Sequence, residues 1–251
     1  MHELETGSPT VGQPMSRRRA VEKLVSAGAG LALLGVPAAA FLATPRRASA
    51  SRGSSMDVTA VLNFALRLEY LEDEFYKAGL AASGLIPTTD RTIFLQISKH
   101  ETAHVNLLLS LLGASAVAKP TFDFTAGGSF PDVFTNYNTF LALSQGFEDT
   151  GVRGYKGQAP DLMANDVALT TALQIHSVEA RHASEVRRLR GQKGWITGNS
   201  TDVSALAAVY AGENNQIQGG VDVGASAAAT EAFDEPLTMA QVLAIANPFI
   251  V

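Results

Sequence analysis

The chain has 251 residues, of which 46% are hydrophobic, and a formal net charge of −5 from 19 basic and 24 acidic side chains. It contains no cysteine, which excludes disulfides, iron–sulfur clusters and thiolate metal sites; any metal must be held by oxygen and imidazole nitrogen. The acidic balance argues against nucleic acid as a partner, and the length suits one well-buried domain with an appendage.

The first 50 residues are typical of a twin-arginine export signal. A Ser-Arg-Arg-Arg run at 16–19 precedes an apolar stretch at 24–43, and Ala-Ser-Ala at 48–50 forms a cleavage site. Cleavage would leave Ser51 first, in a mature chain with 13 basic and 21 acidic residues and a net charge of −8. The alternative is an uncleaved anchor, for which the stretch is nearly long enough but poorly hydrophobic. We expect export to the periplasm, the cell envelope or the medium, with no membrane span in the mature chain.

Apolar residues recur at the helical period in four long segments, which we expect to be helices at 57–81, 90–112, 131–158 and 160–190. Asp57 is suited to cap the first helix and Gly113 to end the second. Short loops join the first helix to the second and the third to the fourth, whereas about seventeen residues separate the second from the third. This pattern predicts an all-α four-helix bundle with one long crossover, in which each pair is antiparallel.

Four glycines interrupt the third segment, and they indicate either a helical bulge or close contact with a neighbouring helix. They are Gly146, Gly151, Gly154 and Gly157.

The chain beyond the bundle shows no motif that indicates chemistry. We divide the sequence into a signal at 1–50, the bundle at 51–195 and a C-terminal extension at 196–251. Trp195 is expected to close the core. The extension is predicted to be mostly irregular, especially the Gly-, Ala- and Ser-rich part at 219–230, with a short apolar helix at 238–246 docked on the bundle.

Two halves of the bundle repeat one pattern: a Glu, about thirty residues, and then Glu-x-x-His. The intervals between the two glutamates are 32 and 31 residues, and a tyrosine follows each leading Glu by seven residues. Residues three or seven apart share one face of a helix, so each Glu-x-x-His pair can present both side chains in one direction. The six repeated residues are Glu69, Glu101 and His104 in the first half and Glu148, Glu179 and His182 in the second; the accompanying tyrosines are Tyr76 and Tyr155.

The four glutamates fall in the apolar seams of their helices, where unpaired carboxylates would repel one another and lose hydration. Two divalent ions would neutralise them, and an oxygen-rich set with two imidazoles suits iron or manganese. The alternative interpretation is that these are ordinary surface Glu and His residues on amphipathic helices.

With these residues in place, the segment 56–192 resembles the ferritin-like superfamily of di-iron carboxylate proteins. The runs Leu-Glu-Tyr-Leu-Glu-Asp-Glu-Phe-Tyr at 68–76 and Ala-Phe-Asp-Glu-Pro at 232–236 are similar to the exported branch that includes plant desiccation-related proteins. The resemblance implies terminal carboxylates at Glu69 and Glu148, bridging carboxylates at Glu101 and Glu179, and imidazole ligands at His104 and His182.

The resemblance also implies that Tyr76 and Tyr155 act in the catalytic site by orienting carboxylates of the opposite helices, with simple core packing as the alternative. Glu72 lies one turn from Glu69 and is expected to support the ligands, the alternatives being a further ligand, a proton relay or a solvated residue at the edge of the bundle. His100 and His176 could also approach the site, or serve as hydrogen-bonded structural histidines.

These features predict an exported protein with two metal ions, iron or alternatively manganese, that oxidises Fe(II) or a small reductant with dioxygen or peroxide, in stress protection. One alternative is peroxide disproportionation by a dimanganese catalase. Another is a non-catalytic metal-binding or structural stress protein of the envelope. The oligomeric state is left open.

Overall fold

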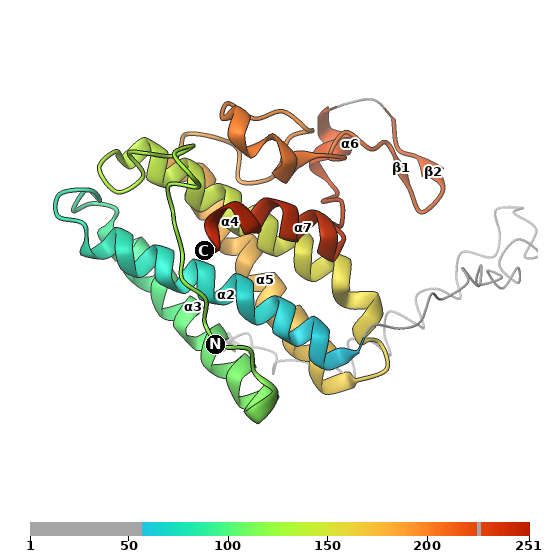
Figure 1. The fold of residues 1–251 in the computed structure, drawn as a ribbon. Helices are drawn as coiled ribbons and strands as arrows, with labels where there is room; N and C mark the ends of the chain where they lie inside the picture. The colour runs from blue at the N-terminus through green and yellow to red at the C-terminus, as the bar shows by residue number, and fades with distance from the viewer. Residues whose placement is uncertain (1–56, 225–226) are drawn as a thin grey trace, which may run out of the picture. The chain divides into compact units, whose positions relative to one another are not determined.

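The computed structural model describes residues 57–224 and 227–251; the expected export signal lies outside this part of the chain. Four long helices form the bundle: α2 (Val58–Ala81), α3 (Arg91–Leu112), α4 (Tyr137–Gln158) and α5 (Asp166–Leu189). Helix α2 packs along α3, and α4 packs along α5 (Figure 1). The prediction of an all-α bundle with one long crossover is confirmed.

The helix ends follow local capping chemistry. The side chain of Asp57 accepts a hydrogen bond from the backbone N–H of Thr59 at the start of α2, as expected. Gly113 follows the last residue of α3 with a φ of +53°, a backbone conformation that other residues rarely adopt.

The third and fourth helices begin later than the sequence pattern predicts. Residues 131–135 form turns, and the side chain of Asn136 caps α4 by accepting from the N–H of Asn138. Pro160 lies in a short 3₁₀ helix, Ala159–Leu162, and Asn165 caps α5 through the N–H of Ala168. In both places an asparagine cap supplies the acceptor that the first turn requires, so it sets the helix start.

The crossover from α3 to α4 is held by the end of the chain. It begins with a 3₁₀ turn, Gly113–Ser115, and then runs extended along the bundle. Phe122 forms a β-bridge with Ile250, and the N–H of Asp123 donates to the carbonyl of Phe249 at 2.9 Å. These backbone contacts with the C-terminal residues therefore hold the crossover in place.

The C-terminal extension consists of short elements joined by irregular segments, as expected. It contains a 3₁₀ helix (Ser204–Tyr210), a two-stranded hairpin of β1 (Ile217–Gln218) and β2 (Val221–Asp222), and helix α6 (Ala227–Glu231). It then forms α7 (Met239–Ala246), which packs on α4, and a last 3₁₀ turn (Asn247–Phe249). Thus the docked apolar helix is confirmed, whereas the irregular segment at 219–230 is partly a hairpin and a helix.

The glycines of α4 serve close contact rather than a bulge, because α4 is α-helical throughout. A Cβ at Gly157 would lie 1.8 Å from the backbone oxygen of Leu237, and a Cβ at Gly154 would lie 3.3 Å from the Val242 side chain. The segment that precedes α7, and α7 itself, can therefore lie against the α4 backbone because these two positions of α4 carry no side chain.

Two apolar clusters fill the bundle, one toward each end. Along α2, Val61, Leu62 and Leu66 belong to one cluster, whereas Leu71 and Tyr76 belong to the other, which Phe64 also joins. The other three helices divide in the same way, and the repeated glutamates fall near the boundary. Trp195 does not close the core as expected: it is 49% exposed, and the next residue, Ile196, is buried instead.

Arg153 of α4 is fully buried and ties the extension to the bundle. Its Nε lies 2.7 Å from Oε1 of Glu213 and donates at 2.8 Å to the carbonyl of Glu235. Its two terminal nitrogens donate to the carbonyls of Val209 and Ala211. One guanidinium thus satisfies three carbonyls and one carboxylate from two stretches of the extension, 209–213 and 235.

We expect Arg153→Ala to lower the free energy of unfolding by about 3–5 kcal/mol, because Glu213 would remain as a buried charge without a partner. Urea denaturation followed by circular dichroism measures this loss. The double variant Arg153→Met with Glu213→Leu removes both charges and should recover most of it. A single-variant loss below about 1 kcal/mol would contradict this role.

Candidate metal centre

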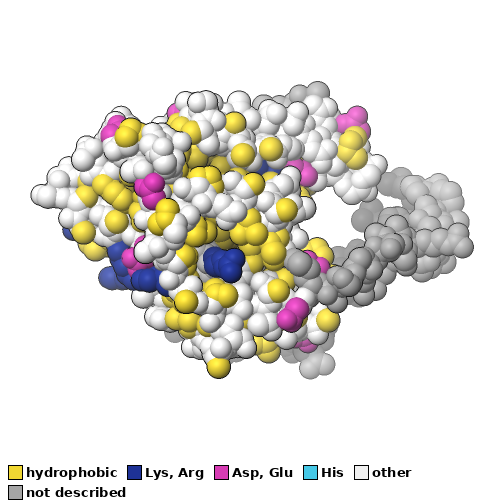
Figure 2. All heavy atoms as spheres, viewed as in Figure 1, with side chains coloured by type: hydrophobic (Ala, Val, Ile, Leu, Met, Phe, Trp, Pro, Cys, Tyr) yellow, Lys and Arg dark blue, Asp and Glu magenta, His cyan; other side chains and the backbone are white. Residues whose placement is uncertain are grey.

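Six side chains of the repeated pattern meet in the middle of the bundle. Glu69 comes from α2 and Glu148 from α4, whereas α3 and α5 each supply a Glu-x-x-His pair. All four glutamates are 0% exposed, so they are not among the scattered acidic side chains seen on one face of the molecule in Figure 2. The interpretation of these residues as ordinary surface groups is therefore wrong.

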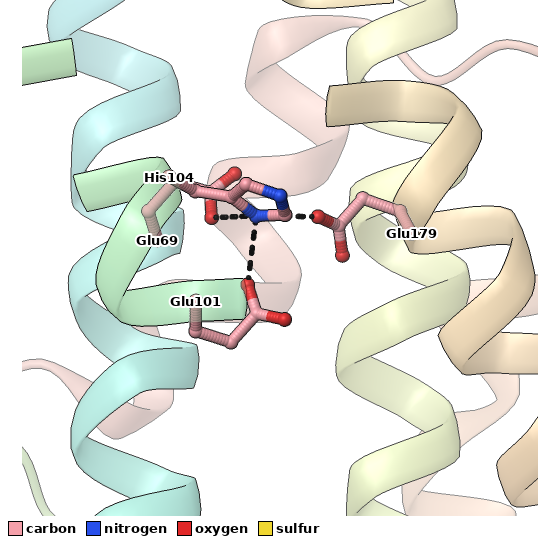
Figure 3. Close-up of side chains that lie close together, drawn as sticks. All are labelled: Glu69, Glu101, His104 and Glu179. Carbon is pink, nitrogen blue, oxygen red and sulfur yellow. Dashed lines mark hydrogen bonds and ion pairs between the residues drawn. The ribbon is translucent and has the colours of Figure 1, made fainter. Parts of the chain in front are cut away.

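His104 lies at the centre of the first group of carboxylates (Figure 3). Its Nδ1 is 3.1 Å from Oε2 of Glu69, Oε2 of Glu101 and Oε1 of Glu179. These contacts come from three helices, so they bring α2, α3 and α5 to one point.

His182 occupies the corresponding place in the second group. Its Nδ1 is 2.9 Å from Oε1 of Glu101, 3.2 Å from Oε2 of Glu148 and 3.9 Å from Oε2 of Glu179. In each group the ligand-type atoms lie within 4.8 Å of one another. Glu101 and Glu179 belong to both groups, which gives two adjacent positions that share two carboxylates.

The donor atoms of this cluster fit metal ions. Oε1 of Glu101 and Oε1 of Glu179 are buried with an imidazole Nδ1 as their close polar neighbour, at 2.9 and 3.1 Å, and Oε2 of Glu179 is buried without a hydrogen-bond partner among the described residues. Buried polar atoms without partners are costly, and clustered carboxylates with imidazoles are the ligands that iron, manganese and zinc accept. The buried Glu and His cluster could therefore hold metal ions.

Without metal, protons compensate for the clustered charge. Burial, together with the neighbouring Glu179, raises the pKa of Glu101 to about 7. Burial and the charge of Glu69 raise the pKa of Glu179 to about 8. Burial opposes protonation of His182, but Glu148 and the hydrogen bond to Glu101 outweigh it and raise its pKa to about 11. The cluster therefore binds protons at neutral pH that a divalent ion would displace.

The two tyrosines bond across the bundle in a reciprocal arrangement. Tyr76 of α2 donates its hydroxyl proton to Oε1 of Glu148 on α4. Tyr155 of α4 donates to Oε1 of Glu69 on α2 at 2.5 Å. Burial and these carboxylates raise the pKa of both phenols well above the usual value, so both stay protonated donors. Each tyrosine fixes the carboxylate of the opposite half, as the resemblance implies.

Glu72 brings a fifth carboxylate close to the centre. It is 2% exposed, and burial together with Glu179 raises its pKa well above the usual value. The duplication places Gly151 at the matching position of the second half. A Cβ at Gly151 would meet Oε1 of Glu72 and Oε2 of Glu179, each at 3.5 Å. One half thus supplies the extra carboxylate, and the other leaves room for it.

The two further histidines have different surroundings. Nδ1 of His100 lies 2.8 Å from Nε2 of His182, so His100 supports the cluster from behind. His176 bonds none of the six repeated residues, and its charged neighbours are Lys156 and Asp234.

Sequence reasoning missed a buried polar network beside the cluster. Arg187 of α5 donates to Oδ2 of Asp149, and the hydroxyl of Tyr210 donates to the same oxygen at 2.8 Å. Asp149 follows Glu148 directly and so faces away from the cluster, toward the extension. Its partner Tyr210 is 61 residues distant, and no local pattern relates the two.

The comparisons with known proteins agree with this geometry. The family model described as ferritin-like domain matches residues 57–192, which span all four long helices and all six repeated residues. The chain belongs to the ferritin-like domain family. No curated protein matches it. Among the described residues of this ferritin-like chain, no helix is long and apolar enough to cross a membrane.

We expect metal binding to this ferritin-like bundle to release protons and to strengthen as pH rises. The raised pKa values mean that the folded metal-free chain holds more protons than the unfolded chain between about pH 5 and pH 8, so its stability falls as pH rises through that range. The apparent metal affinity should rise about tenfold per pH unit for each proton displaced. Calorimetry with Mn(II) in buffers of different ionisation enthalpy counts these protons; an affinity independent of pH from 6 to 8 would contradict the assignment.

Proposed function

We propose that this ferritin-like protein holds two iron ions and oxidises Fe(II) or a small reductant with dioxygen or peroxide. The observation that carries the proposal is the enclosed set of four glutamates and two histidines, in which two imidazole nitrogens face four buried carboxylates. Such a set in an apolar core needs cations, and two divalent ions bring +4 against −4.

The contacts support one assignment of ligands to two positions. Glu69 and His104 would hold one ion, Glu148 and His182 the other, and Glu101 with Glu179 would bridge both. Bound iron would supply the electrons that reduce dioxygen or peroxide. The protein ligands would stabilise the oxidised metal, because carboxylate oxygen is a hard, negatively charged donor.

The remaining residues hold the ligands and exclude water. Tyr76 and Tyr155 keep one oxygen of Glu148 and of Glu69 occupied, which fixes how the other oxygen faces the centre. The apolar clusters on either side close the bundle above and below the carboxylates. Charges act strongly in such a dry site, so small differences in ligand position matter.

We further propose that the chain is exported with its metal already bound. The supporting observation is the arginine run at 16–19 with the cleavage site at 48–50, both outside the described residues. A buried centre suits export after folding. Sequencing the N-terminus of the secreted protein tests this, and Ser51 is the expected first residue.

Metal analysis of the purified protein is the decisive experiment. We expect about two iron ions per chain. Glu101→Ala and His104→Ala should lose metal and keep their helical circular dichroism, because each removes a ligand without shortening a helix. Glu185→Ala, which changes a glutamate of α5 outside the cluster, is the matched control and should keep full metal content. Full metal content in both ligand variants would contradict the proposal.

Assays on the same preparations distinguish the candidate reactions. Fe(II) added to the native protein should consume dioxygen faster than Fe(II) added to the Glu101→Ala variant. Two manganese ions with oxygen evolved from peroxide would instead support a catalase. Zinc without turnover would support a structural metal site.

A further inference from the structure

The two halves of the duplicated site differ in what stands behind the imidazoles. His100 directly precedes Glu101, and the matching position before Glu179 is Val178. The Nδ1 of His100 is 2.8 Å from Nε2 of His182, with the two rings stacked at 5.1 Å between centroids and 10° between planes. Among the described residues, no side chain hydrogen-bonds Nε2 of His104. Only one of the two candidate imidazole ligands therefore has a protein partner on its outer nitrogen.

The pair continues to the surface through Gln96. The Nε2 of this exposed side chain lies 2.7 Å from Nε2 of His100. In the metal-free protein His182 holds protons on both ring nitrogens, because its Nδ1 faces the carboxylates of Glu148 and Glu101. Its Nε2–H then donates to Nδ1 of His100, which carries its own proton on Nε2 and donates to the amide oxygen of Gln96, with the amide turned so that its oxygen faces the ring.

Metal binding keeps this direction along the same chain. Coordination through Nδ1 of His182 needs the lone pair there, so the metal displaces the Nδ1 proton while the Nε2–H continues to donate to Nδ1 of His100. Among the described residues, His104 has no such partner to select its tautomer.

We propose that His100 is a positioning residue that fixes the metal-binding tautomer and ring orientation of His182, so that the two metal positions are unequal and the His182 position binds more tightly. The proposal rests on the dinuclear site proposed above. Residues that orient a metal-ligating histidine change metal affinity by about 10–100-fold, so a difference of that size between the two positions is expected.

The first test is a calorimetric titration of the metal-free full chain with Mn(II). The native protein should bind in two steps of different affinity. His100→Phe keeps a planar ring against His182 but removes the acceptor nitrogen. It should weaken the tighter step by about 10–100-fold and leave the weaker step unchanged.

The second test replaces the side chain that contacts His100 at the surface, Gln96, with one that can only accept a hydrogen bond. Gln96→Glu offers His100 only acceptor oxygens and should strengthen the tighter step. The duplication supplies a matched control at Gln174, an exposed glutamine at the corresponding position of α5, where Val178 stands in place of the histidine. Gln174→Glu adds the same charge without a histidine to receive it and should change neither step.

A spectroscopic readout separates positioning from packing. In protein labelled with ¹⁵N-histidine, His182 should carry protons on both ring nitrogens without metal and on Nε2 alone with Zn(II) bound. Two equal binding steps in the native protein, or equal weakening of both steps by His100→Phe, would overturn the proposal and leave the dinuclear site standing. Absence of any Mn(II) binding by the native protein would overturn the dinuclear site itself.

Discussion

Four carboxylates enclosed in the middle of an apolar bundle are the constraint on which the rest of this structure depends. Removing such charges from water costs many kcal/mol unless protons or cations compensate for them. The raised pKa values of Glu101 and Glu179 show protons taking that role in the metal-free chain. The apolar clusters on both sides then stabilise the bundle around a centre that is itself unfavourable, so the ligand layer and the core have to be considered together.

The C-terminal extension completes this enclosure. Arg153 lies five residues after Glu148 on α4 and bonds three carbonyls of the extension, while the missing side chain at Gly157 lets the backbone of Leu237 reach α4. Helix α7 follows directly and packs over α4 (Figure 1). Residues 140–155 of the helix that supplies Glu148 are therefore all buried, and the helix is held from the extension as well as from the bundle.

The duplication is not symmetric in detail, and the differences cluster around the candidate metal positions. Glu72 of the first half faces Gly151 of the second, and His100 of the first half corresponds to Val178 of the second. The repeated ligands give each position the same donor types. The unrepeated neighbours give each position different charge and different hydrogen bonding, which is how two chemically similar positions come to differ.

The sequence by itself determined the four helices, the six repeated residues and the tyrosine at seven residues after each leading glutamate, because these depend on periods of three, four and seven along one helix. It also placed α7. The later starts of α4 and α5 depended on which asparagine side chain reaches a backbone N–H, and spacing does not show this. Only the tertiary structure decided that Tyr76 bonds Glu148, that His100 bonds His182 and that Arg153 binds the extension, since each pair joins residues 56 to 82 positions apart. Contacts at that separation arise from how helices pack and which faces meet, and no local pattern encodes them.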